Sequence, residues 1–146
     1  MHPAHTKYYM AATEAEYAAC LALPEARDIA ELPLDMPLIY ADRAGRIVGW
    51  LGTRLTDDGV VLVTPLVLSA TLTTGRIVLL RLLEALERVL PLLGIHDYAF
   101  ALDARAAAPY QQAVEALCGP PRHHLHGEAW YIRHVAADVL QTTKEC

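Results

Sequence analysis

Residues Gly59 to Ile95 read GVVLVTPLVLSATLTTGRIVLLRLLEALERVLPLLGI, and this stretch decides the fold. Residues 60–68 are aliphatic and β-branched with almost no polar break, which is the composition of a strand covered on both faces. Small and hydroxylated residues interrupt the pattern at 69–75, and from Arg76 the chain is apolar nearly all round. We therefore predict a central strand, a turn, and a long helix at about 75–93 that is buried against the sheet.

The turn between this strand and this helix predicts an anion site. The first N–H groups of a helix have no partner inside the helix, and the helix dipole makes that end attractive to negative charge. Thr73 or Thr74 can serve as the N-cap. A strand–turn–helix unit that binds nothing is the alternative, and the pattern alone leaves it open.

Composition limits the function classes. The chain has 146 residues, enough for a single domain over 1–146, and its net charge of −5 argues against non-specific nucleic-acid binding. No apolar run reaches the roughly 18 residues of a membrane span, because charged residues break the richest segment. The first ten residues, MHPAHTKYYM, lack the pattern of a signal peptide. Three unevenly spaced cysteines indicate no disulfide framework, so we expect a cytoplasmic protein.

The remaining elements follow from alternation, capping and turn residues. The Thr13-x-x-Glu16 capping box opens a helix, and the turn at 42–45 joins the two strands of a hairpin. We predict strands at 7–12, 37–41, 46–53, 97–103 and 130–135, helices at about 14–23 and 109–117, and a turn or short helix between Pro24 and Pro33. Residues 119–124 are predicted to form a loop.

This order predicts an α/β (α+β) fold. We expect a mixed, mostly antiparallel central sheet flanked by helices, with a parallel βαβ unit at 60–103. The core covers about 7–135, and 136–146 form a C-terminal tail.

Five local phrases stand in the order of a known family. They are YYMAATEAEYAACLAL from Tyr8, IYADRAGRIVGWLGTR from Ile39, LLEAL from Leu82, AVEALCGP from Ala113 and GEAWYIR from Gly127. In this order they resemble the opening strand and helix, the second and third strands, the cofactor helix, a later helix and the last strand of the GNAT superfamily of acyl-CoA-dependent N-acyltransferases. Small phage-type members of the superfamily look similar.

The resemblance implies an acyl-CoA cofactor, here acetyl-CoA, whose pyrophosphate lies at the start of the long helix. The family's loop follows Arg/Gln-x-x-Gly-x-Gly/Ala, whereas this chain keeps one glycine there and places the bulky Ile77 and Val78 where small residues are usual. The cofactor-binding residues carried over to this loop are Thr73, Thr74, Gly75 and Arg76. A protein that has lost the cofactor is the alternative.

The resemblance also implies a site for acyl transfer to an amine. In the family, backbone N–H groups of a bulged central strand polarise the thioester carbonyl; Leu66, Val67 and Leu68 match that strand. Pro65 predicts the bulge, because proline cannot join a strand ladder. The tyrosine that often serves as the family's general acid corresponds to Val114 in this chain, so this match fails.

Two further residues are therefore the catalytic candidates. Tyr110, one helical turn before Val114, is the substitute acid, and a half-buried structural tyrosine is its alternative. Asp103 is the best carboxylate for a base by position, with helix capping as its alternative. No metal is expected, since His123 and His126 lack a completing Cys or carboxylate at a recognisable spacing. Cys118 fits a small core residue better than a nucleophile.

Three functions remain. The first is N-acetyl transfer to a primary amine of a small molecule or a protein. The second is a non-catalytic GNAT-fold binding or structural protein, with a phage origin among the options. The third is an unrelated α/β domain. Neither nucleic acid nor membrane is an expected partner, and a homodimer is left open.

Overall fold

The computed structural model describes residues 5–29, 35–103, 108–125 and 128–135. Its strands within these ranges form one sheet. They are β1 (Thr6–Met10), β2 (Ile39–Arg43), β3 (Arg46–Leu55), β4 (Val61–Leu68), β5 (Asp97–Asp103), β6 (His123–Leu125) and β7 (Glu128–His134). The helices are α1 (Glu14–Leu21), α2 (Gly75–Val89) and α3 (Ala108–Cys118), with short 3₁₀ turns η1 (Pro24–Ala26) and η2 (Leu90–Leu93).

The sheet is mixed and mostly antiparallel, as predicted. Its strand order is β1-β2-β3-β4-β5-β7-β6, which places β4 at the centre. β4 pairs in parallel with β5, and every other neighbouring pair in the described chain is antiparallel. Because α2 lies between the two parallel strands in the sequence, residues 61–103 form the predicted βαβ unit.

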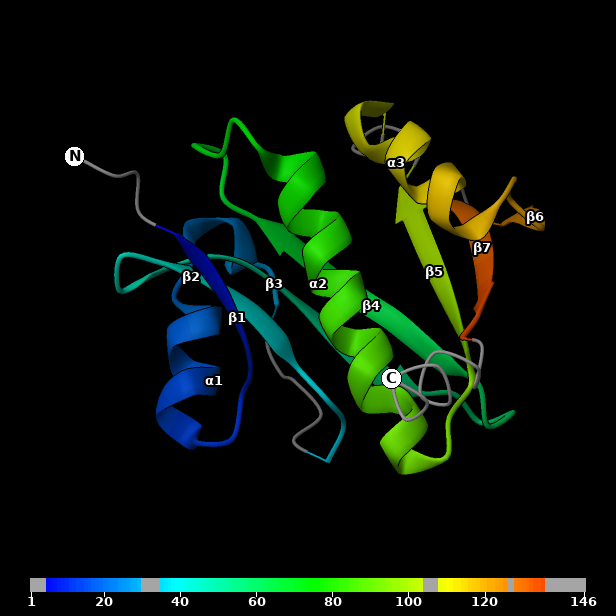
Figure 1. The fold of residues 1–146 in the computed structure, drawn as a ribbon, viewed down its shortest axis with the longest axis horizontal. Coiled ribbons are helices and arrows are strands. Elements are labelled where there is room, and N and C mark those ends of the chain that lie inside the picture. Colours follow the sequence, from blue (N-terminus) through cyan, green and yellow to red (C-terminus); the bar gives the residue numbers. More distant parts are fainter. Residues whose placement is uncertain (1–4, 30–34, 104–107, 126–127, 136–146) are drawn as a thin grey trace, which may run out of the picture.

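Helices cover both faces of the sheet and make two separate cores. In Figure 1, α2 runs diagonally across the sheet and α3 lies beside β5 and β7. The core beneath them includes Leu79, Leu82, Leu83 and Leu86, which are fully buried. On the opposite face, α1 and η1 pack over Trp50 and Val67. The β4 strand is therefore covered on both sides, which explains why Thr64 is its only polar residue.

The ends of the helices follow from capping chemistry. At the start of α1 the Thr13 side chain accepts from the Glu16 N–H and Glu16 accepts from the Thr13 N–H, which confirms the capping box. α2 stops at Val89, four residues earlier than predicted, and Pro91 lies in the 3₁₀ turn that follows. Gly94 then closes the turn with a left-handed φ of 77°. No helix in the described ranges has both the length and the apolar character that a membrane crossing requires.

Most predicted boundaries differ from the structure by one or two residues. β2 covers Ile39–Arg43 rather than 37–41, β3 ends at Leu55 rather than at residue 53, β7 covers Glu128–His134 rather than 130–135, and α3 covers Ala108–Cys118 rather than 109–117. The first strand covers Thr6–Met10 rather than 7–12, and α1 ends at Leu21 rather than residue 23. The prediction of a loop at 119–124 is wrong at its end, because His123 and His124 belong to β6 and pair with β7. A three-residue edge strand depends on pairing rather than on its own periodicity, so its sequence gives little sign of it. Pro33 and the tail at 136–146 lie outside the described residues.

Candidate functional site

The two parallel strands separate near the middle of the sheet. β4 and β5 pair at three positions, Val61 with Tyr98, Leu62 with Ala99 and Val63 with Phe100. Beyond Val63, β4 continues along β3 as far as Leu68, and β5 continues along β7 as far as Asp103. Figure 1 shows the strands diverging toward their C-terminal ends. The backbone of Leu66 to Leu68 therefore makes no pair with the described part of β5.

A bulge in β4 lies where this separation begins. Leu51 pairs with Leu66 and Thr53 with Val63, so two steps along β3 correspond to three along β4. The extra residue lies at Thr64-Pro65, which are joined by a cis peptide bond. Opposite them, a Cβ added to Gly52 would come within 3.2 Å of Pro65 Cδ and 3.3 Å of the Thr64 oxygen. The bulge that Pro65 predicts is confirmed, and glycine on β3 leaves room for it.

The bulge reverses which side chains face α2. Before it, Val61 and Val63 lie in the core beneath α2. After it, Leu66 and Leu68 pack against that core, whereas Val67 lies in the core beneath α1. Because side chains alternate with a period of two, one extra residue turns the rest of the strand over. Pro65 indicates the bulge, but the sequence of β4 does not show which side chains face α2 after it.

The loop from Ser69 to Leu72 is held by contacts of its own. The Ala70 N–H donates to Oε2 of Glu25 at 2.9 Å, the Thr71 N–H to the Ser69 hydroxyl at 3.4 Å, and the Leu72 N–H to the Ser69 carbonyl at 3.1 Å. The bond from Ala70 is the main cause that lowers the pKa of Glu25. These N–H groups therefore already have acceptors, one of which is a carboxylate.

The first turn of α2, by contrast, has N–H groups to offer. Thr74 is the N-cap, as predicted, but its side chain caps no N–H of the helix. Its Oγ1 instead accepts a hydrogen bond from Nη2 of Arg43 at 3.2 Å. Within the described chain, no acceptor takes the N–H groups of Gly75, Arg76 and Ile77, which precede the first helical bond from the Val78 N–H to the Thr74 carbonyl.

The bulky residues of the loop point in different directions. Val78 is buried in the core beneath α2, so its side chain faces away from solvent, while Ile77 is 58% exposed. The Gly75 position is buried, and the Arg76 side chain is exposed in the first turn. The arrangement can accept an anion at the helix start, with Gly75 and Arg76 supplying N–H groups.

The two catalytic candidates lie on elements that reach the same edge. Tyr110 is in the first turn of α3, and Asp103 is the last residue of β5, opposite Glu128 on β7. Figure 1 shows the starts of α2 and α3 at the edge where β4 and β5 end. The side chains of Tyr110 and Asp103 lie outside what the structure describes, so their roles stay predictions. Val114 is fully buried in the core, where it packs and offers no proton.

Neither described cysteine has the character of a nucleophile. Burial raises the pKa of Cys20 to about 12 and that of Cys118 to about 11, so both thiols are protonated at neutral pH. Residues 5–29, 35–103, 108–125 and 128–135 contain no group of three or more His, Cys, Asp or Glu that could hold a metal ion. His126 lies outside these ranges.

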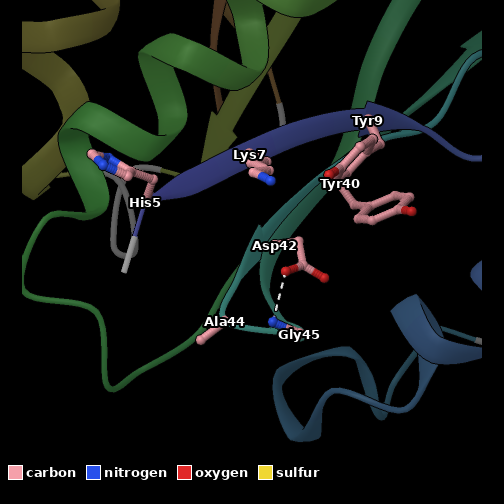
Figure 2. A pocket seen from close by; sticks show the side chains of 7 residues that line it. All are labelled: His5, Lys7, Tyr9, Tyr40, Asp42, Ala44 and Gly45. Atoms are coloured by element: carbon pink, nitrogen blue, oxygen red, sulfur yellow. Dashed lines mark hydrogen bonds between the residues drawn. The ribbon is translucent and has the colours of Figure 1, made fainter. Parts of the chain in front are cut away.

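A separate hollow of about 560 Å³ lies on the face of β1 and β2 away from Arg43. Figure 2 shows His5 just before β1, Lys7 and Tyr9 on β1 and Tyr40 and Asp42 on β2, with Ala44 and Gly45 in the turn. The rings of Tyr9 and Tyr40 are 5.5 Å apart and tilted by 35°. Sequence reasoning missed this hollow, although the polar and aromatic residues at alternate positions on both strands were visible. Its contacts support no reaction step.

Comparisons by sequence identify no relative: no family model matches the chain, and no curated protein does. Comparisons by structure do. A protein of the GNAT family from Desulfovibrio desulfuricans aligns with a TM-score of 0.63 at 13% identity, covering 90% of this chain and 100% of that one. The ribosomal-protein-S18-alanine N-acetyltransferase of Escherichia coli aligns at 0.63 and 12% identity, covering 90% and 95%.

A third similar structure contains coenzyme A. The PaiA N-acetyltransferase of Thermoplasma acidophilum, in complex with coenzyme A, aligns with a TM-score of 0.58 at 13% identity, covering 69% of this chain and 62% of that one. Identities this low establish the fold and leave the activity to be tested. With its separated β4 and β5, its bulged central strand and its βαβ unit, the chain has the fold of the GNAT superfamily.

Proposed function

We propose that this protein binds acyl-CoA and transfers its acyl group, an acetyl group by preference, to a primary amine of a small molecule or a protein. The observation that carries the proposal is the separation of β4 from β5 beside a helix start with unoccupied N–H groups. An elongated ligand with an anionic middle and an apolar arm fits such a surface. The acyl-CoA supplies an activated acyl group as a thioester.

The chain's own residues divide the binding between them. Thr73, Thr74, Gly75 and Arg76 hold the pyrophosphate through N–H groups, hydroxyls and one guanidinium. The backbone of Leu66, Val67 and Leu68 holds the arm of the cofactor where β5 has moved away. The ionised carboxylate of Glu25 already accepts the hydrogen bond of the Ala70 N–H, and its negative charge repels an anion from this part of the loop.

Acid and base come from the adjacent edge. Tyr110 donates a proton to the leaving sulfur, and Asp103 accepts a proton from the attacking amine. Tyr110 and Asp103 are assigned by their place on α3 and β5. The acceptor amine reaches the site from solvent beside the β4 backbone.

A non-catalytic binding protein is the second candidate. It is favoured by the buried Val114 at the family's tyrosine position and by the single glycine of the loop. Titration calorimetry with CoA and acetyl-CoA tests cofactor binding, and thiol release from acetyl-CoA across a panel of amines and peptides tests turnover. Binding with turnover supports the transferase, and binding without turnover supports the second candidate. Absence of CoA binding contradicts both the cofactor and the transfer, and it supports a non-catalytic protein that has lost the cofactor.

A further inference from the structure

Arg43 connects three elements at the mouth of the candidate site. It is the last residue of β2 and is half-buried. Its Nε donates to Thr6 Oγ1 on β1 at 2.9 Å, and its Nη2 donates to Thr74 Oγ1, the N-cap of α2, at 3.2 Å. The guanidinium therefore lies at the start of α2, although Arg43 precedes Thr74 by 31 residues.

Two sources of positive potential meet at this position. The start of a helix carries positive partial charge, and the positive charge of a nearby guanidinium adds to it. Arg43 has no carboxylate partner in the described chain, where the salt bridges join Arg81 to Glu84 and Arg133 to Glu87. Its two recorded acceptors are neutral hydroxyls. An anion at the start of α2 would therefore be attracted both by the helix N-terminus and by the Arg43 guanidinium.

The bond to Thr74 also determines what that hydroxyl can do. A hydroxyl has one hydrogen to donate, and accepting a bond from a guanidinium leaves this hydrogen for another partner. The side chain of Thr74 caps no N–H of the helix. Its O–H is thus available beside the N–H groups of Gly75 and Arg76, which have no acceptor in the described residues.

We propose that Arg43 is a positioning residue for the anionic group of the ligand: it holds Thr74 as a hydrogen-bond donor toward that group and adds positive charge from β2. This inference rests on the proposed function, because it takes the pyrophosphate of CoA as the anion. It adds a residue of β2 to the proposed anion site, on the side of α2 away from β5. The loop residues 73–76 alone do not provide this contribution.

The experiment measures CoA affinity by calorimetry at several salt concentrations. Arg43→Ala is expected to weaken CoA binding by roughly tenfold and to make the affinity less sensitive to salt, since one close charge is lost. Arg46→Ala is the matched control, because it removes the same charge. Arg46 is exposed and lies opposite Arg43 in the same hairpin. It should change the affinity by less than about twofold.

A double-mutant cycle separates positioning from general charge. If Arg43 acts partly through Thr74, then Thr74→Val should cost much less in the Arg43→Ala background than alone. Arg43→Lys, which keeps the charge without the planar fork, should bind CoA with intermediate affinity and serves if the alanine variant is poorly folded. Melting curves without ligand verify that each variant is folded.

Two results overturn the inference in distinguishable ways. If the unmodified protein binds CoA and Arg43→Ala binds it as tightly, or no more weakly than Arg46→Ala does, Arg43 has no role in the site and the proposed function stands. If the unmodified protein has no measurable affinity for CoA, the proposed function fails and the inference fails with it.

Discussion

The phenolic oxygen of Tyr98 on β5 lies 2.8 Å from Oε2 of Glu87 on α2. Tyr98 is fully buried, and its hydroxyl donates to a carboxylate that also accepts from Nε and Nη2 of Arg133 on β7, at 3.3 and 3.2 Å. The Arg133 Nη1 donates to the Leu117 carbonyl at the end of α3. This cluster joins α2 and α3 to β5 and β7, the strands on the far side of the separation from β4. It therefore holds the separated strands in place.

Removing the Glu87 carboxylate should therefore destabilise the fold. We expect Glu87→Ala to lower the free energy of unfolding by about 1.5–3 kcal/mol, because it leaves the buried Tyr98 hydroxyl and Arg133 without their shared acceptor. Glu84→Ala is the matched control on the same helix, since its bond to Arg81 joins two exposed side chains and should contribute less than about 1 kcal/mol. Urea unfolding measures both, and equal losses would contradict the structural role of the cluster.

The contact between Tyr40 and Glu16 predicts a pH dependence of stability. The Tyr40 hydroxyl donates to Glu16 Oε2 at 2.5 Å. This bond is the largest cause that raises the pKa of Tyr40 from 10.0 to about 12, and the largest that lowers the pKa of Glu16. A raised tyrosine pKa means that the stabilisation is complete below pH 10 and is lost as the pH rises toward 12. On the acid side, the pKa of Glu16 is lower in the folded than in the unfolded chain. The stabilisation from its carboxylate is therefore lost when the pH falls through the lowered pKa of Glu16.

Tyr40→Phe tests this dependence with little change in packing. The difference in melting temperature between the unmodified protein and Tyr40→Phe should be constant at neutral and mildly alkaline pH and should close between pH 10 and 12. Tyr9→Phe is the control: the ring of Tyr9 lies 5.5 Å from that of Tyr40, and the bond to Glu16 Oε2 comes from the Tyr40 hydroxyl. A difference that persists unchanged to pH 12 would show that Glu16 and Tyr40 are not coupled in solution.

Arg76 should contribute directly to cofactor affinity. If its guanidinium makes a charge-assisted contact with the pyrophosphate, Arg76→Ala should weaken CoA binding by ~1.5–3 kcal/mol. Arg88→Ala is the control, because Arg88 is exposed in the last turn of the same helix. Calorimetry measures both variants. Equal affinities for the two would show that the Arg76 guanidinium makes no contact with the pyrophosphate.

Tyr110 should act on turnover rather than on binding. Losing a general acid typically costs ~10²–10⁴ in rate, so Tyr110→Phe should lower thiol release from acetyl-CoA in that range. CoA affinity and melting temperature should remain close to those of the unmodified protein. Unchanged turnover per folded molecule together with lower stability would mean that Tyr110 is a structural residue.

The sequence by itself determined the elements and their order. The aliphatic run of β4, the apolar run of α2, the Thr13–Glu16 capping box and the hairpin turn at Ala44-Gly45 all depend on residues close together in the chain. Their physical causes are alternation, capping and left-handed turn geometry, which act locally. For the same reason Pro65 predicted a bulge, and a long buried helix after a buried strand predicted the parallel pair.

Tertiary structure alone decided how these elements make a site. The reversal of facing after the bulge, the separation of β4 from β5 and the pairing of β6 arise from the register between strands. The contacts of Arg43 with Thr74 and of Glu25 with Ala70 join residues 31 and 45 positions apart. Such contacts leave no periodic trace in the sequence, because each needs one side chain of suitable reach at a position fixed by the packing of other elements. Whether the start of α2 attracts or repels an anion is therefore set by charges that only the folded chain brings there.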